Sequence, residues 1–340
     1  MKDIIHDEVK NIIVIQTAFI GDTALALFFC YNIKILFPNA KITFISTPVA
    51  ASLIRSCTII DDCIAFDKRK EYKKIRDVKK FAEKINELKP DIVFSLHRSL
   101  RTSILVKNIN SKKKIGFSNA AMSSVYDIKC SYYNYQHETQ KNNQLLKPFG
   151  YTESDEYPIL NFNGESEIDG ADQSKELIYL SPGSVWETKQ WIPEYFNKVA
   201  KELENLGYQV VIGGSDKEID LCSFVANGTN AINIAGKLKL NETINVIKKC
   251  KLVVCNDSAA THMAGLAGIK CLSIYGATSE IFGFYPISHG AKTIKNEQIN
   301  CSPCAIHGER KCPLGHFKCM RGLAPETVME RIAEMLKETN

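Results

Sequence analysis

The N-terminus lacks the apolar core of a signal peptide, because residues 1–8 are rich in charged side chains. It also lacks an uninterrupted membrane span, since Gln16, Thr17 and Asp22 break up the apolar stretch at residues 12–29. We therefore expect a cytoplasmic protein. The twelve cysteines are mostly scattered singly through apolar segments, so we expect reduced, buried thiols rather than disulfides.

Two common ligand-binding motifs are also missing. The chain has no Asp-x-Asp pair to hold a divalent metal ion and no Walker loop to enclose a phosphate. Its formal net charge is only +5. We expect neither a cofactor nor a nucleic-acid partner, and a bound phosphate would depend on lysine, hydroxyl groups and helix N-termini.

The positive charge is unevenly distributed along the chain. Residues 67–89 contain ten Lys or Arg against five Asp or Glu, and residues 112–114 are three consecutive lysines. One interpretation is the solvated face of an amphipathic helix near residues 72–88. The other is a surface that meets anionic lipid or an anionic acceptor, and the sequence leaves both open.

The length of 340 residues favours two domains, because single cores rarely grow this large. Short β-branched runs, such as residues 11–16, alternate with helical patterns, such as residues 193–206, from end to end of the chain. This alternation predicts parallel sheets built from βαβ units. The polar, acidic segment 151–172 is typical of a linker. We expect an α/β fold of two Rossmann-like, doubly wound domains facing across a cleft, residues 1–165 and residues 173–340.

The most informative segment is residues 252–262, where an apolar strand pattern runs into a helix pattern. Asn256, Asp257 and Ser258 offer capping oxygens to that helix. Such a junction places free backbone N–H groups at the carboxyl edge of a parallel sheet, where α/β proteins bind phosphates. Asp257 and His262 would both face a ligand there. The alternative is an ordinary junction with a capping Asp and a packed His.

Three further loops follow predicted strands and open helices: residues 16–23, 181–191 and 213–218. In the first, Asp22 is either a charge complement to the helix N-terminus or a general base. In the second, Ser184 and Lys189 suit a phosphate. In the third, Glu218 suits ribose hydroxyls. Together with Asp257 and its neighbours, these loops favour a nucleotide-sugar site.

Five segments occur in an order and spacing that resemble the bacterial heptosyltransferases of lipopolysaccharide core assembly, glycosyltransferase family 9. They are Phe19–Asp22, Leu96–Arg101, Pro182–Pro193, Asp257–His262 and Tyr275–Ser279. The resemblance extends from about residue 10 to residue 335 and includes a cysteine-bearing segment, residues 301–319, before a C-terminal helix. Ala259 stands where the family usually has Gly, and Val185 stands where some members have a second hydroxyl.

The resemblance implies an inverting, metal-independent transfer of heptose from ADP-heptose to the inner core of lipopolysaccharide. By their match to the family motifs, Asp22 is the base and Lys189 stabilises the departing diphosphate. The first domain then binds the acceptor and the second binds the donor. The implied donor-binding residues are Ser184, Glu218, Asp257, Ser258, Ala259 and His262.

The acceptor implied by the family is a lipid-anchored, anionic saccharide. Arg98 or Arg101 would hold its carboxylate or phosphate. A peripheral contact with the cytoplasmic face of the inner membrane is expected, and the basic segment 67–89 is the candidate surface. Two alternatives stay open: a family 9 transferase that uses another nucleotide sugar (rhamnose or an N-acetylhexosamine), and a nucleotide-sugar-binding protein without turnover.

The cysteine-bearing segment has four thiols within nineteen residues: Cys301, Cys304, Cys312 and Cys319. A structural zinc site is one interpretation, although a single CxxC pair is weaker than a double one. Free packed thiols or an oxidisable pair is the other. No motif places this segment at the reacting centre, so we expect no catalytic role for it.

Overall fold

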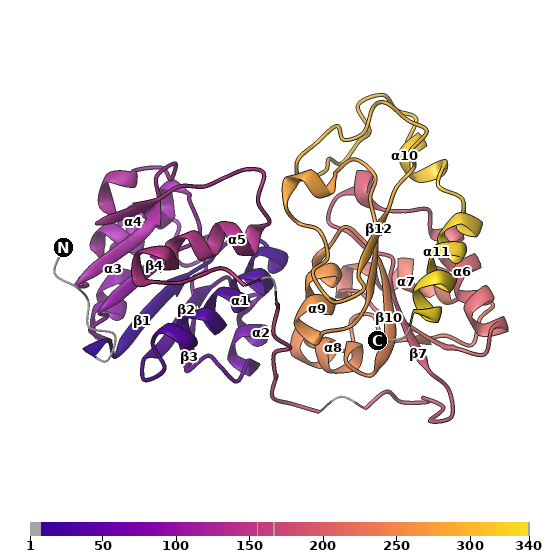
Figure 1. Ribbon diagram of the computed structural model, residues 1–340, viewed down its shortest axis with the longest axis horizontal. Coiled ribbons are helices and arrows are strands. Elements are labelled where there is room, and N and C mark those ends of the chain that lie inside the picture. The colour runs from indigo at the N-terminus through magenta and orange to yellow at the C-terminus, as the bar shows by residue number, and fades with distance from the viewer. Residues whose placement is uncertain (1–7, 155, 166, 339–340) are drawn as a thin grey trace. The chain divides into compact units, whose positions relative to one another are not determined.

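In the computed structural model the chain forms two compact units, residues 1–163 and residues 164–340 (Figure 1). The structure describes residues 8–154, 156–165 and 167–338. Each unit contains one six-stranded sheet, and every strand pairing within it is parallel. The predicted α/β class with two Rossmann-like units is confirmed. The two units divide between residues 163 and 164, within two residues of position 165, where the sequence predicts that the first domain ends.

The N-terminal unit alternates strands and helices, and its sheet has the order β3-β2-β1-β4-β5-β6. Its strands are β1 (Asn11–Ile15), β2 (Lys41–Ser46), β3 (Asp62–Ala65), β4 (Ile92–Ser95), β5 (Lys113–Phe117) and β6 (Ile128–Cys130). Its α-helices are α1 (Ile20–Leu36), α2 (Ala51–Ser56), α3 (Ile75–Asn86), α4 (Leu100–Asn108) and α5 (Glu138–Asn143).

Helices cover this sheet on both faces, as two neighbouring residues of β4 show. Val93 belongs to a buried cluster with Phe81 of α3 and Leu105 of α4. The next residue, Phe94, points to the opposite face, where its ring lies 5.3 Å from that of Phe29 in α1. A sheet buried on both faces explains why its strands read as continuous apolar runs.

The C-terminal unit repeats this plan, and its sheet has the order β12-β11-β10-β7-β8-β9. Its strands are β7 (Leu177–Ser181), β8 (Gln209–Ile212), β9 (Ile232–Asn233), β10 (Cys250–Asn256), β11 (Cys271–Ile274) and β12 (Lys292–Ile294). Its α-helices are α6 (Pro193–Asn205), α7 (Ile219–Ala226), α8 (Leu240–Ile247), α9 (Ala259–Ala267), α10 (Lys318–Arg321) and α11 (Pro325–Lys337).

The strand order reverses once in each sheet, and this fixes where ligands bind. In the N-terminal unit the reversal lies between β1 and β4, and in the C-terminal unit it lies between β7 and β10. In open α/β sheets the ligand crevice lies beyond the carboxyl ends of the two strands at this switch point. The segments that follow β1, β4, β7 and β10 are therefore the candidate site segments.

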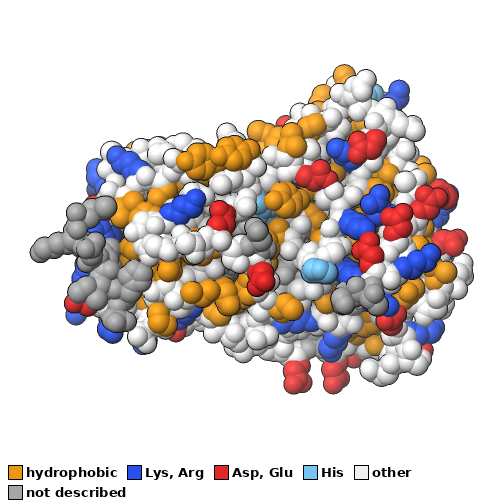
Figure 2. Space-filling view, in the orientation of Figure 1, with side chains coloured by type: hydrophobic (Ala, Val, Ile, Leu, Met, Phe, Trp, Pro, Cys, Tyr) orange, Lys and Arg blue, Asp and Glu red, His pale blue; other side chains and the backbone are white. Residues whose placement is uncertain are grey.

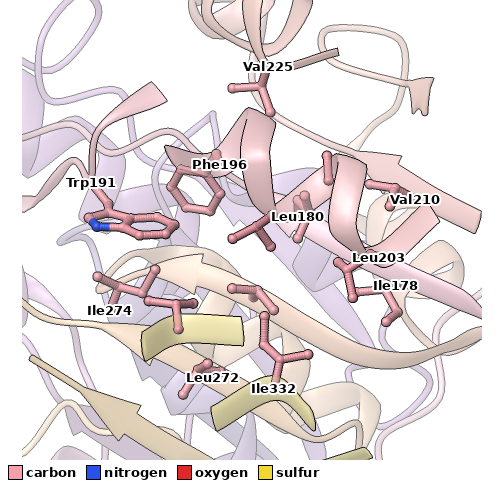
Figure 3. Packing of buried hydrophobic residues seen from close by; sticks show 14 of the residues in the cluster. Ile178, Leu180, Trp191, Phe196, Leu203, Val210, Val225, Leu272, Ile274 and Ile332 are labelled. Atoms are coloured by element: carbon pink, nitrogen blue, oxygen red, sulfur yellow. The ribbon is translucent and has the colours of Figure 1, made fainter. Parts of the chain in front are cut away.

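The core of the C-terminal unit anchors one of these segments. Trp191 is completely buried, and its ring lies 5.0 Å from that of Phe196 at the start of α6 (Figure 3). Leu180 of β7, Ile274 of β11 and Ile332 of α11 belong to the same cluster. The C-terminal helix predicted from the sequence is α11, and it packs beside α6 (Figure 1).

The surface of the C-terminal unit mixes acidic and basic side chains on the face shown at the right of Figure 2. In the N-terminal unit, the basic segment forms α3, which is amphipathic as predicted. Val78, Phe81 and Ile85 are buried, whereas Lys79 and Lys80 are exposed. None of the described helices is long and apolar enough to cross a membrane.

Candidate active site

The predicted strand-to-helix junction lies after β10 in the C-terminal unit. β10 ends at Asn256, and α9 begins at Ala259. Ser258 is the N-cap, and its hydroxyl accepts the N–H of Ala260 at 3.4 Å. Because the first turn of a helix leaves N–H groups without intrahelical partners, this end of α9 attracts an anion.

Lys189 and Asp257 form an ion pair at this junction. The Lys189 Nζ lies 2.6 Å from Oδ2 of Asp257, and both side chains are largely buried. The hydroxyl of Thr278, which follows β11, donates to the same carboxylate oxygen at 2.7 Å. Two residues that the sequence assigns to the donor, 68 positions apart, are thus brought together, and an ammonium group lies beside the N-terminus of α9.

His262 lies in the first turns of α9 and is 4% exposed. Its Nδ1 atom is buried and has no hydrogen-bond partner among the described residues. Burial, with a contribution from the nearby Lys189 charge, lowers the His262 pKa to about 3, so the ring is neutral. An unpaired buried polar atom costs about 1–3 kcal/mol, and such atoms are retained where a ligand or a function needs them.

Asn256 is a site residue that the sequence indicates only as one of three capping residues, beside Asp257 and Ser258. Its Oδ1 accepts the N–H of Trp191 at 2.9 Å, and its Nδ2 donates to the carbonyl of Pro182 at 2.7 Å. Both ends of the loop that carries Ser184 and Lys189 are therefore tied to β10. A sequence feature that could have indicated this loop-binding role is an asparagine at the end of a strand, together with a loop that contains a buried Trp.

Glu218 lies beside the loop that carries Ser184. A Cβ on Gly183 would clash with the Glu218 carboxylate, so a side chain at residue 183 would displace that carboxylate from its present position. The other carboxylate oxygen, Oε2, accepts the N–H of Ser215 at 2.7 Å and its hydroxyl at 2.8 Å. The capping interaction orients Glu218, and the absence of a side chain on Gly183 admits it next to Ser184.

In the N-terminal unit, Asp22 follows β1 as the third residue of α1. Its Oδ2 accepts the N–H of Phe19 at 3.3 Å. Burial raises the Asp22 pKa, although backbone hydrogen bonds and the positive charges of Arg98 and Lys141 offset part of that effect. A carboxylate that is harder to ionise is a stronger proton acceptor once it is ionised.

Helix α5 carries a buried ion pair that the sequence reasoning missed. Lys141 Nζ lies 3.4 Å from Oε2 of Glu138, and the two side chains are 3% and 6% exposed. The hydroxyl of Tyr132 donates to Oε2 of Glu138 at 2.8 Å. Burial and the negative charge of Asp22 raise the Glu138 pKa. The signal was an opposite-charge pair three residues apart, which shares one helix face.

Arg98 joins this cluster, whereas Arg101 does not. The guanidinium carbon of Arg98 lies 3.7 Å from the centroid of the Tyr132 ring. Arg101 instead donates to two backbone carbonyls, those of Lys68 at 2.5 Å and Lys73 at 3.2 Å. Arg101 therefore holds the turn before α3 in place, and of the two predicted acceptor ligands only Arg98 adds charge beside Asp22.

His97, between β4 and α4, has polar contacts with the hydroxyls of Thr17 and Thr102 at 3.0 Å and 2.8 Å. Burial, assisted by the charges of Lys68 and Arg98, lowers the His97 pKa to about 4. The ring is therefore neutral near pH 7. It ties the segment after β1 to the segment after β4 at the switch point of the sheet.

The four cysteines of the segment 301–319 are free thiols. Among the described residues, no three His, Cys, Asp or Glu side chains are grouped so that they could hold a metal ion. A structural zinc at Cys301, Cys304, Cys312 and Cys319 stays a prediction. The singly scattered Cys30, Cys250, Cys255 and Cys271 are buried and free, as expected.

The sequence of this chain matches a known protein family. Residues 78–317 match the model of glycosyltransferase family 9 (heptosyltransferase). The chain belongs to this family. It is therefore a glycosyltransferase, as its motifs imply.

Among the relatives of this family 9 glycosyltransferase is lipooligosaccharide heptosyltransferase 2 of Campylobacter jejuni, which is 25% identical over 335 residues. The match covers 95% of this chain and 97% of the relative. Lipopolysaccharide heptosyltransferase 2 of Salmonella typhimurium is 29% identical over 173 residues, 48% of each chain.

Two solved structures show the same fold. The family 9 glycosyltransferase of Veillonella parvula superimposes with a TM-score of 0.85 at 22% identity, over 97% of this chain and 98% of that one. Escherichia coli ADP-heptose lipopolysaccharide heptosyltransferase II gives a TM-score of 0.79 at 18% identity, over 96% and 98% of the chains. The predicted GT-B-type fold class is confirmed.

Proposed function

We propose that this glycosyltransferase transfers heptose from ADP-heptose to the inner core of lipopolysaccharide, with inversion at the sugar and without a metal ion. The observation that carries the proposal is the grouping of Lys189, Asp257 and the unpaired Nδ1 of His262 at the N-terminus of α9. The full-length similarity to a heptosyltransferase 2 supports heptose as the transferred sugar.

The donor diphosphate is assigned to the C-terminal unit. An ammonium group has three donors, so Lys189 can keep Asp257 and still donate to a phosphate oxygen. The N-terminal amides of α9 and the hydroxyl of Ser184 supply further donors. These groups stabilise the charge of the departing ADP, which is the task of a metal ion in enzymes with an Asp-x-Asp pair. Asp257 and Glu218 accept hydrogen bonds from sugar and ribose hydroxyls.

The acceptor is assigned to the N-terminal unit, with Asp22 as the base. Asp22 takes the proton of the acceptor hydroxyl while that oxygen forms a bond to C1 of the heptose. The bond from C1 to the donor phosphate oxygen breaks, and ADP leaves with the electron pair. One base and a single displacement give inversion. Arg98 pairs with a carboxylate or phosphate of the acceptor, which is an anionic, lipid-anchored saccharide.

A donor panel with ADP-, UDP-, GDP- and dTDP-linked sugars tests this proposal, with inner-core lipopolysaccharide as the acceptor. We expect turnover with ADP-heptose, an inverted anomeric configuration in the product by NMR, and unchanged initial rates in EDTA. Preference for a rhamnose or N-acetylhexosamine donor would show that the sugar is assigned wrongly. Donor binding without any turnover would support a binding protein, and a rate that EDTA abolishes and magnesium restores would contradict metal independence.

A further inference from the structure

Part of the cysteine-bearing segment, which we call the 301–309 loop, lies against the lysine of the donor site. Gly308 in this loop is buried and has φ +85. A Cβ there would lie 2.8 Å from Cδ and 2.9 Å from Cγ of Lys189, and 2.9 Å from Cβ of Trp186. The bare backbone at Gly308 is therefore the surface on which the aliphatic stem of Lys189 rests.

Thr188, the residue before Lys189, fastens the two segments together. It is 2% exposed. Its backbone N–H and its hydroxyl both donate to the carbonyl of Glu309, at 3.1 Å and 2.9 Å. The same hydroxyl accepts the N–H of Glu309 at 2.7 Å. The Thr188 hydroxyl thus both donates to and accepts from the backbone of Glu309. The side chain of Glu309 is exposed.

A third segment, the turn after β11, completes the contact. The carbonyl of Thr188 accepts the N–H of Ala277 at 3.3 Å. The carbonyl of Ala277 accepts the N–H groups of Cys304 at 2.9 Å and Ala305 at 3.1 Å. The next residue in that turn, Thr278, holds Asp257, which is the ionic partner of Lys189. Both members of the ion pair are therefore attached to one hydrogen-bonded junction of three loops.

We propose that Thr188 is a positioning residue that, together with the 301–309 loop, holds the ammonium of Lys189 at the donor diphosphate. This inference rests on the proposed function, in which Lys189 binds that diphosphate. A lysine side chain has a flexible four-carbon stem, and fixing it before the ligand arrives removes an entropic cost from binding. The cysteine-bearing segment then acts as a wall of the donor site, a position that no sequence motif indicates.

The first test removes the Thr188 hydroxyl while keeping its shape. Thr188→Val should weaken ADP binding by about tenfold or more, as expected when a charge-assisted contact is misplaced, and raise the KM for the donor without changing the KM for the acceptor. Thr188→Ser keeps the hydroxyl, so its ADP affinity and its KM for the donor should match those of the parent. Glu309→Ala is the matched control, because only the backbone of Glu309 takes part, and it should behave like the parent. Calorimetric titration with ADP and steady-state kinetics give the readouts.

A second test displaces the Lys189 side chain directly and does not depend on Thr188. Gly308→Ala and Gly315→Ala place a side chain at nearly the same backbone angles, φ +85 and φ +70. The Cβ at residue 308 meets Lys189, whereas no atom of the described part of the chain lies within 4 Å of a Cβ at residue 315. We expect Gly308→Ala to weaken ADP binding and Gly315→Ala to bind ADP like the parent. This comparison can be made even if Thr188→Val fails to fold.

The outcomes separate this inference from the proposed function. If Lys189→Met leaves ADP binding unchanged, the assignment of Lys189 to the diphosphate is wrong. If Lys189→Met weakens ADP binding but Thr188→Val and Gly308→Ala bind ADP like the parent, the positioning role is wrong. If Glu309→Ala weakens binding as much as Thr188→Val does, the effect does not come from the Thr188 hydroxyl, and the inference also fails.

Discussion

Asp22 and Asp77 occupy the same position in two helices of the N-terminal unit. Each is the third residue of its helix, and each accepts the N–H of the residue three positions earlier, Asp22 from Phe19 at 3.3 Å and Asp77 from Lys74 at 3.1 Å. They differ in surroundings, because Asp22 lies at the switch point of the sheet beside a buried ionic cluster. Comparing substitutions of Asp22 and Asp77 therefore distinguishes the effect of losing a helix cap from the effect of losing a proton acceptor.

Asp22→Asn should lower turnover by about 10²–10⁴-fold with little change in ADP affinity, because the base is lost and the donor contacts remain. Asp77→Asn removes an equivalent capping carboxylate and should leave turnover near that of the parent. Asp77→Asn should lose a small amount of thermal stability with its cap, whereas in Asp22→Asn this loss is offset because a buried charge is removed. Equal turnover in the two variants would show that Asp22 acts only as a cap.

Lys141→Met tests the electrostatic influence of α5 on the base. The positive charge of Lys141 lowers the Asp22 pKa, so its removal should raise that pKa further. Since the base must be ionised, activity is lost as the pH falls through this pKa, and the acid limb of the kcat/KM profile should move to higher pH. Arg98, Lys68, Glu138 and Tyr132 are the other ionisable groups coupled to Asp22 in this cluster.

Lys147→Met is the matched control for Lys141→Met, because Lys147 follows α5 closely in the chain but is exposed. Its acid limb should coincide with that of the parent. Thermal unfolding should be measured for both variants, since Lys141 is also the partner of a buried Glu138. An unshifted acid limb in folded Lys141→Met would show that α5 does not influence the base.

His262→Leu should stabilise the ligand-free protein, by about 1–2 kcal/mol, because it removes a buried nitrogen that has no partner among the residues that the structure describes. The gain should grow on acidification. The His262 pKa is about 3 in the folded chain and about 6.5 when unfolded, so the parent loses stability as the pH falls from about 6.5 towards 3. Urea titrations at pH 7 and pH 5 give the comparison.

The same variant should respond less to ADP than the parent does, because the ligand partner of the imidazole is gone. The rise of the unfolding temperature on adding ADP measures this response. A His262→Leu protein that is less stable without ligand, or that keeps the full ADP response, would show that the imidazole is a packing residue.

The basic helix α3 should bind anionic membranes in a salt-sensitive way, since each Lys or Arg near such a surface contributes about 1 kcal/mol. Reversing four exposed lysines to Glu should weaken binding to phosphatidylglycerol vesicles more than tenfold: Lys73, Lys74, Lys79 and Lys80. A charge-matched control reverses exposed lysines of the other unit: Lys175, Lys198, Lys201 and Lys237. Equal losses in both proteins would indicate a general charge effect rather than a docking surface.

The sequence predicted those elements whose apolar period is strong. The buried strands β1 and β10 and the amphipathic α3 and α6 were found within a few residues, because one face or the whole element is apolar. Helix α5 was missed because its buried residues, including Glu138 and Lys141, are polar. A buried polar helix has no hydrophobic period, so only its charge spacing could have indicated it.

Site residues were predictable where they follow a strand, and less so where the chain must fold to bring them together. Asp22, Lys189 and Asp257 all follow strands at the switch points of their sheets. The link between Thr188 and Glu309 spans 121 residues, and no local pattern encodes it. Arg101 donates hydrogen bonds to the carbonyls of Lys68 and Lys73, in the turn before α3. The position of that turn could not be predicted from the sequence, so this structural role of Arg101 could not be predicted either.

The side-chain amide of Asn256 has a mechanical consequence. Through one residue, β10 holds both ends of a loop that is 65 to 74 positions away in the chain. We therefore expect this loop and α9 to move together, so that ADP meets a preformed surface on this unit. ADP should accordingly associate in a single kinetic phase, with a rate proportional to its concentration and no plateau.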